Sequence, residues 1–225
     1  MVGVITLSTA NTVERVGFAH DVGFRMFQVV LPSWGALSDV ELTAYFKDVC
    51  GMFPDSQFVH YNLPRAKRIL EGEDYRRLID AIPNLVGTKT TSGGLPRAAS
   101  LMRHSSELQH FFGEANFPHG CMYGECSLLS SLWPMAPRQT RELFEAGRTR
   151  QLDKLFKLQK WFQDLVTDVF SPLPPGERID GAYDKMIQRF GGLEELPLRL
   201  LSPYQCYTEE QYQACKRVFL ERYAD

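Results

Sequence analysis

The chain has 225 residues, of which 44% are hydrophobic and 23% charged, and its formal net charge is −2 at pH 7. This length is enough to bury a large core, and the near-neutral charge gives no reason to expect nucleic acid or an anionic membrane as a partner. No apolar run approaches the roughly 20 residues that span a bilayer, and the first residues do not resemble a signal peptide. The five cysteines are scattered and odd in number, which favours free thiols in a reducing cytoplasm.

Short apolar stretches alternate with amphipathic helical patterns through the first part of the chain. Strands are predicted at residues 2–7, 26–31, 57–61, 85–89, 108–112 and 127–131. Helices are predicted between them, beginning near Asn11 and Thr12, at the Ser38–Glu41 capping box, around Tyr75 and Leu78, and at residues 95–102. This order is typical of parallel β/α folds, in which each strand is followed by a helix.

The sequence after Pro137 has a helical pattern, with a long amphipathic segment at residues 152–170. Pro172, Pro174 and Pro175 interrupt it, and two further helices are predicted, the last one capped by Thr208. We therefore predict a partial barrel domain at residues 1–148 and a C-terminal helical extension at residues 149–225.

Six βα units follow one another with no sign of a reversed strand. That pattern is compatible with a barrel or with a doubly wound sheet, and a complete barrel needs eight units. In both folds the reactive groups lie at the carboxyl ends of the strands.

A lysine and a tyrosine stand at two consecutive strand ends, Tyr61 and Lys89. Burying an ammonium is costly, so a partly desolvated lysine tends toward the neutral amine, which attacks carbonyl carbons to form imines. A nearby phenol would relay protons during that chemistry. The alternative is structural, with Lys89 extending into solvent and Tyr61 serving as a core aromatic.

The segments VHYNLP (residues 59–64) and LVGTKTTSGG (residues 85–94) resemble two signatures of the dihydrodipicolinate synthase and N-acetylneuraminate lyase family. The resemblance implies a (β/α)8 TIM barrel, here incomplete with about six units. It implies that Lys89 forms a Schiff base with a 2-keto acid such as pyruvate and that Tyr61 relays protons. It also implies a lyase, aldolase or hydratase that needs no metal or organic cofactor and assembles as a homotetramer.

The same resemblance assigns the substrate contacts. Thr91 matches the KxT arrangement of the lyases, and Gly113 and Glu114 end a strand read as FFGE. Leu129 corresponds to a position that contributes only backbone contacts. The small-molecule partners implied are a 2-keto acid and, as second substrate, an aldehyde.

The sequence departs from the family at its start and in its second-substrate region. The family has two βα units before the segment matched here, and they carry a GTTGE-type loop for the keto-acid carboxylate, which has no counterpart in this sequence. Ser33 and Trp34 stand where a dihydrodipicolinate synthase has a tyrosine, and Ala66 stands in place of its arginine. The sequence thus reads as a fragment, a mis-started gene model or a shortened paralogue, and the alternative function is that of an inactive paralogue acting as a binding protein.

Two other polar groups have structural interpretations. Cys121 and Cys126 lie near His119, but no second ligand pair follows, so no metal site is predicted. His60 precedes Tyr61 and is expected to point to the opposite side of its strand, toward the helices.

Overall fold

The computed structural model describes residues 1–176 and 178–224, and the chain divides into two compact units, Met1–Leu129 and Ser130–Asp225. The domain boundary predicted after residue 148 falls inside the second unit, at the end of its first helix. A division of the chain into folding domains at that point stays a prediction.

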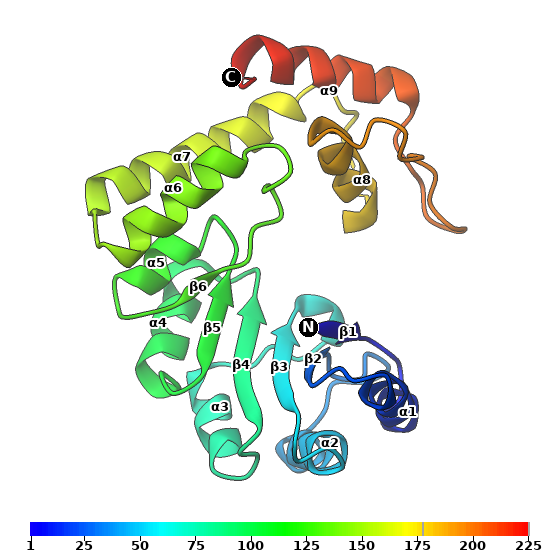
Figure 1. Ribbon diagram of the computed structural model, residues 1–225, viewed down its shortest axis with the longest axis vertical. Coiled ribbons are helices and arrows are strands. Elements are labelled where there is room, and N and C mark those ends of the chain that lie inside the picture. The colour runs from blue at the N-terminus through cyan, green and yellow to red at the C-terminus, as the bar shows by residue number, and fades with distance from the viewer. Residues whose placement is uncertain (177, 225) are drawn as a thin grey trace. The chain divides into compact units, whose positions relative to one another are not determined.

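The first unit is built on a six-stranded sheet in which every neighbouring pair is parallel (Figure 1). The strands follow in chain order as β1 (Val2–Val4), β2 (Met26–Val29), β3 (Gln57–Asn62), β4 (Leu85–Thr90), β5 (Gln109–Phe112) and β6 (Ser127–Leu128). This arrangement confirms the predicted run of βα units. The sheet forms an arc of a barrel that does not close, because β1 and β6 are its two edges.

Five α-helices accompany the strands. They are α1 (Thr9–Asp21), α2 (Asp39–Gly51), α3 (Gly72–Ile79), α4 (Gly94–His104) and α5 (Phe117–Cys121), with a short 3-10 turn, η1 (Pro64–Ala66). The capping box of Ser38 and Glu41 is present in both directions, as predicted. The first helix begins earlier than predicted, because the Ser8 hydroxyl caps it by accepting from the Asn11 amide. The sequence reading missed α5 and η1, which have one turn or little more.

The core of this unit lies between the sheet and the helices. Phe27, Val29 and Phe58 point to that side and are fully buried, as are Phe46 of α2 and Leu101 of α4. Alternate residues point to the other side of the sheet, where burial is less complete. Met26, for example, leaves 41% of its surface exposed. The sheet therefore has one packed face and one accessible face.

The second unit is helical, consisting of α6 (Pro137–Arg148), α7 (Leu152–Val169), α8 (Asp180–Phe190) and α9 (Glu209–Arg222). α7 packs on both α6 and α9, and it buries Leu155, Phe162 and Leu165. The predicted cap of the last helix is confirmed, since Thr208 and Gln211 form a capping box. Among the described residues, no helix is both long and apolar enough to cross a membrane.

Candidate active site

Tyr61 and Lys89 lie side by side at the carboxyl ends of β3 and β4. The two residues are paired in the parallel ladder, so their side chains leave the sheet on the same, accessible side. Phe111 of β5 is paired with Lys89 on its other flank. All three side chains are half-buried. Lys89 thus stands between two aromatic neighbours on the open face of the sheet.

An irregularity in the ladder brings this pair together. Phe58 pairs with Leu85, whereas the next residue, Val59, pairs with Gly87, so β4 holds one extra residue at this point. Without the extra residue, Tyr61 would be paired with Thr88, and Lys89 would be paired with the next residue, Asn62. The bulge therefore places the amine and the phenol ring on one face.

The Lys89 Nζ atom lies 4.0 Å from the centre of the Tyr61 ring. At this distance the ring face attracts the ammonium form. Neither Lys89 nor Tyr61 makes a side-chain hydrogen bond or ion pair with another described residue. The amine is thus held by the ring alone and is not neutralised by a carboxylate.

Gly87 is required by the close approach of β5. A Cβ atom at this position would lie 2.7 Å from the carbonyl oxygen of Gln109, a contact that backbone cannot accommodate without shifting. Gly87 is two residues before Lys89 and points to the same face of β4. Its missing side chain lets β4 and β5 pair closely just below the amine.

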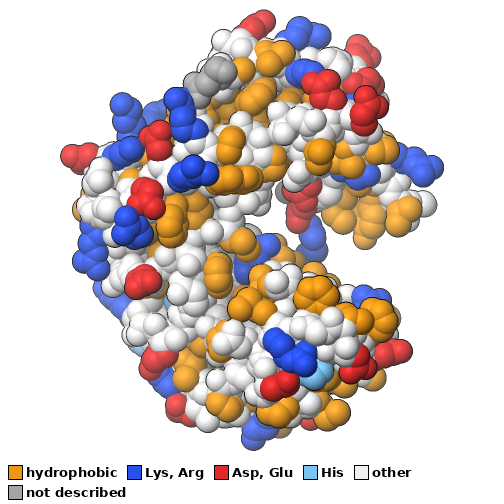
Figure 2. All heavy atoms as spheres, in the orientation of Figure 1, with side chains coloured by type: hydrophobic (Ala, Val, Ile, Leu, Met, Phe, Trp, Pro, Cys, Tyr) orange, Lys and Arg blue, Asp and Glu red, His pale blue; other side chains and the backbone are white. Residues whose placement is uncertain are grey.

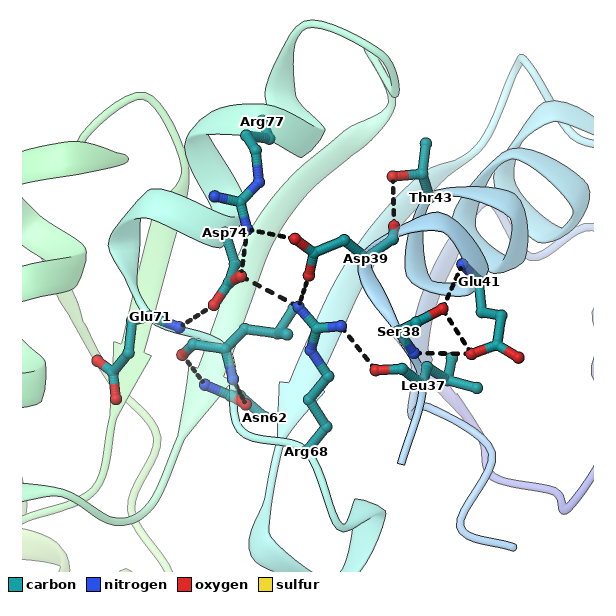
Figure 3. A network of polar contacts seen from close by, with 11 residues as sticks. Leu37, Ser38, Asp39, Glu41, Thr43, Asn62, Arg68, Glu71, Asp74 and Arg77 are labelled. Atoms are coloured by element: carbon teal, nitrogen blue, oxygen red, sulfur yellow. Dashed lines mark hydrogen bonds and ion pairs between the residues drawn. The ribbon is translucent and has the colours of Figure 1, made fainter. Parts of the chain in front are cut away.

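The loops that follow β2 and β3 are fastened to each other by polar contacts (Figure 3). The Asn62 side chain both donates to the Leu70 carbonyl and accepts from its amide, which ties down the loop after Tyr61. Arg68 donates to the Leu37 carbonyl and pairs with Asp39 and Asp74. This network fixes the course of the chain on both sides of the β3 strand end.

The four other predicted contacts lie after the neighbouring strand ends. Thr91 directly follows β4 and is exposed, while Gly113 and Glu114 follow β5 and are half-buried. The Gly113 carbonyl accepts from the amides of Asn116 and Phe117, and the Leu129 amide donates to the Phe112 carbonyl at 2.8 Å. All four lie at the carboxyl ends of strands, as Lys89 does. These ends lie together because every strand of the sheet runs in the same direction.

The packed face of the same strands carries a second polar row. His60 is fully buried, and its Nδ1 atom lies 2.7 Å from the Tyr75 hydroxyl of α3, as expected for a residue that faces the helices. His110 Nε2 contacts the Ser105 carbonyl, so Nε2 carries the proton and Nδ1 accepts from the Thr88 hydroxyl. Burial lowers the pKa of His60 to about 3 and that of His110 to about 4.

Two further features lie away from the strand ends. A cleft of about 500 Å³ between α2 and α3 is lined by helix residues such as Leu42, Lys47 and Arg77, on the helix side of the sheet. The Cys121 and Cys126 sulfurs are 3.7 Å apart, and their hydrogen bond together with burial raises the pKa of Cys126. Within residues 1–176 and 178–224, no three His, Cys, Asp or Glu side chains are grouped to hold a metal ion.

The sequence reading missed the residues that support the site. The bulge at Val86 has no sequence signal. Nothing in the sequence indicates that Asn62 binds the Leu70 backbone or that Arg68 binds Leu37, Asp39 and Asp74, because these partners are distant in the sequence. Phe111 could have been found, since it belongs to the predicted fifth strand and alternates with the buried His110 and Phe112.

Comparison with known proteins places the chain in a family. The sequence profile of the Dihydrodipicolinate synthetase family matches residues 1–218. The chain belongs to this family. A 4-hydroxy-tetrahydrodipicolinate synthase from Marinobacter nauticus is 28% identical over 173 residues, which cover 74% of this chain and 59% of that protein. This chain therefore spans less than two thirds of the length of that relative.

Solved structures of the family share the fold. The N-acetylneuraminate lyase from Fusobacterium nucleatum superposes with a TM-score of 0.79 at 15% identity, covering 97% of this chain and 72% of that one. A prophage protein of the dihydrodipicolinic acid synthase family from E. coli K12, solved in complex with pyruvate, gives 0.81 at 18% identity, with 97% and 73% covered. The sheet of the first unit is thus an arc of the TIM barrel characteristic of this family.

Proposed function

We propose that the chain carries the Schiff-base lysine of a lyase acting on a 2-keto acid, with Lys89 as the nucleophile. The observation that supports this most strongly is the amine itself. It is half-buried at the carboxyl edge of a family barrel sheet, it lies 4.0 Å from the centre of the Tyr61 ring, and no carboxylate among the described residues pairs with it. A structural lysine would be expected to have an acceptor or to reach bulk water.

The proposed chemistry needs the amine in its neutral form. The Lys89 nitrogen attacks the C2 carbonyl carbon, and its proton passes to the carbonyl oxygen. The carbinolamine hydroxyl then takes up a second proton, supplied through the Tyr61 phenol, and leaves as water to give an iminium. The iminium withdraws electrons from C3, which can then lose a proton or break its bond to the next carbon, leaving an enamine. Adding an electrophile to C3 reverses that step, and hydrolysis of the imine returns Lys89.

Tyr61 is the proposed proton relay, because its ring is the immediate neighbour of the amine. Thr91, Gly113, Glu114 and the Leu129 backbone are the proposed substrate contacts, at strand ends flanking Lys89. The names of the relatives support this class of substrate: one synthesises 4-hydroxy-tetrahydrodipicolinate, one cleaves N-acetylneuraminate and one binds pyruvate. An aldehyde as second substrate and a homotetrameric assembly are part of the same proposal.

Trapping with borohydride tests the proposal. The purified chain is incubated with pyruvate and sodium borohydride, and its intact mass is measured. We expect one added reduced pyruvyl group in the unchanged protein and none in Lys89→Arg, which keeps the positive charge but cannot form an imine. Lys67→Arg is the matched control, because Lys67 also follows a strand end but its ammonium already donates to the Trp34 carbonyl.

The control must retain the adduct. Equal labelling of the Lys89→Arg variant and the unchanged protein would contradict the proposal. So would the absence of any adduct in folded protein, with folding judged by circular dichroism.

A further inference from the structure

Arg97 of α4 is largely withdrawn from solvent. Lysine and arginine side chains lie at many points of the surface shown in Figure 2, with aspartate and glutamate among them. The Arg97 side chain, in contrast, is only 18% exposed. Its Nε atom donates to the Glu71 carboxylate at 2.9 Å, and its Nη1 atom donates to the Ser92 hydroxyl at 3.1 Å. One guanidinium therefore joins two segments that are distant in the sequence.

Gly93 leaves the space against which the Arg97 side chain packs. Gly93 caps the N-terminus of α4 with a φ of +97°, a conformation that glycine adopts readily. A Cβ atom at this position would lie 2.6 Å from the Cζ atom of Arg97 and 2.7 Å from its Cβ atom, so there is no room for a side chain. The loop of residues 91–94, which directly follows Lys89 and Thr90, is therefore in close contact with Arg97.

Glu71 connects Arg97 with the segment that follows Tyr61. Glu71 comes directly after Leu70, whose amide and carbonyl are both bound by the Asn62 side chain (Figure 3). Asn62 is in turn the residue after Tyr61 in β3. A continuous series of contacts thus connects the end of β3 with the loop after β4.

The helices α3 and α4 are also joined without Arg97. The Gly72 amide donates to the Ser100 hydroxyl at 2.9 Å. The buried residues of α4 are Ala98, Leu101 and Met102, which do not depend on the guanidinium. A variant without the Arg97 side chain should therefore still fold.

We propose that Arg97 is a positioning residue that holds the loop of residues 91–94 in place and so keeps Thr91 where it contacts a bound 2-keto acid. This role rests on the proposed function, in which Lys89 bonds to the keto acid and Thr91 contacts it. Arg97 acts through the loop, because its hydrogen bonds go to Ser92 and Glu71. Releasing the loop should weaken binding of the keto acid and leave the reaction of the amine largely intact.

Borohydride trapping of the whole chain at a series of pyruvate concentrations tests this role. Arg97→Ala should raise the half-saturating pyruvate concentration about tenfold, as expected for the loss of charge-assisted hydrogen bonds. The trapping rate at saturating pyruvate should stay within about twofold of that of the unchanged protein. Arg97→Lys keeps a positive charge beside Glu71 but lacks the planar fork that also reaches Ser92, so its half-saturating concentration should lie between the other two.

Arg103→Ala is the matched control. Arg103 lies nearer the other end of α4, and its guanidinium lies 5.1 Å from the centre of the Tyr123 ring. The variant removes an arginine from the same helix without touching the loop, so both trapping parameters should remain unchanged. Circular dichroism verifies that each variant is folded.

Limited proteolysis gives a readout that does not require Lys89 to react. Cleavage by proteinase K within residues 91–94, located by mass spectrometry, should be about tenfold faster in Arg97→Ala than in the unchanged protein, because cleavage requires the loop to open. Arg103→Ala should be cleaved there at the unchanged rate. Absence of trapping in the unchanged protein would contradict the proposed function, and the cleavage rates would still decide the role of Arg97.

Three results would overturn the role of Arg97. One is equal cleavage of the loop in Arg97→Ala and the unchanged protein. Another is a half-saturating pyruvate concentration that Arg97→Ala leaves unaltered while the unchanged protein is trapped. The third is an equal rise in Arg103→Ala, which would mean that any loss of an arginine from α4 disturbs binding.

Discussion

Polar side chains on the two faces of β3, β4 and β5 differ in burial and in hydrogen bonding. On the packed face, His60, Thr88 and His110 are completely buried and contact Tyr75, Ser105 or one another. On the accessible face, the next residue of each strand belongs to the row Tyr61, Lys89 and Phe111. These side chains are half-buried, and the Lys89 amine lies 4.0 Å from the centre of the Tyr61 ring with no hydrogen-bond or ion-pair partner among the described residues.

The two rows have different roles although their residues are neighbours in the sequence. The row on the packed face is structural, and Lys89 on the accessible face is the proposed reactive group. Each residue of the packed row makes at least one buried hydrogen bond, which holds its side chain in place; the His60 Nε2 atom has no hydrogen-bond partner among the described residues. A nucleophile must remain accessible and free of a permanent acceptor. Burial alone would have pointed to the histidines, whereas accessibility and missing partners point to Lys89.

The largest effect expected on stability is acid destabilisation through the packed row. Burial lowers the folded-state pKa of His60 to about 3 and that of His110 to about 4, below the usual value of about 6.5. Unfolding therefore takes up protons as the pH falls below about 6.5, and the folded state loses stability in that direction. The loss should approach about 1.4 kcal/mol per pH unit for each histidine.

Urea denaturation followed by circular dichroism at pH 7, 6 and 5 measures this loss. Carboxyl groups titrate mainly below this window, so the slope belongs to the histidines. The variant His110→Asn should have a shallower slope than the unchanged protein. An identical slope in the two proteins would mean that His110 is not held neutral by the fold.

A change on the accessible face should disturb both stability and reactivity. In Gly87→Ala the new methyl group meets the Gln109 carbonyl oxygen, so β4 and β5 have to separate, at a cost of about 1–3 kcal/mol. Pyruvate trapping should also slow, because Lys89 lies two residues further along β4. The matched control is Gly35→Ala, where a Cβ atom has no neighbour within 4 Å. Equal stability of the two variants would contradict the proposed strand spacing.

The smallest expected effect is that of a change at Thr91, which is compared with the same change at Thr88. Thr88→Val keeps the shape but removes the hydroxyl that donates to His110, so we expect a loss of about 1–3 kcal/mol. Thr91→Val makes the same change at an exposed position and should alter stability by less than about 0.5 kcal/mol. Thermal denaturation of both variants gives the difference. A larger loss at Thr91 would reverse the assignment of the two sides.

The sequence predicts the order of elements well because alternating apolar strands and capped helices are local patterns. The parallel sheet, the Ser38–Glu41 capping box and the direction of His60 followed from such patterns. The positions of Tyr61 and Lys89 at consecutive strand ends followed from the strand pattern, and the family resemblance favoured their reactive interpretation. Their direct pairing in the ladder could not be predicted, because it depends on a bulge in β4, and a single extra residue leaves no local pattern. Arg68 was missed for a similar reason, since its partners come from two segments far from each other in the sequence, Leu37 with Asp39 and Asp74.

The most direct test of the account is to locate the reduced pyruvate adduct by peptide mapping after proteolysis of a single trapped sample. Every lysine of the chain then competes under the same conditions. The account predicts that the adduct is found on Lys89 and that exposed lysines such as Lys67 and Lys160 remain unmodified. Label spread over the exposed lysines, with Lys89 no more reactive than the rest, would contradict it.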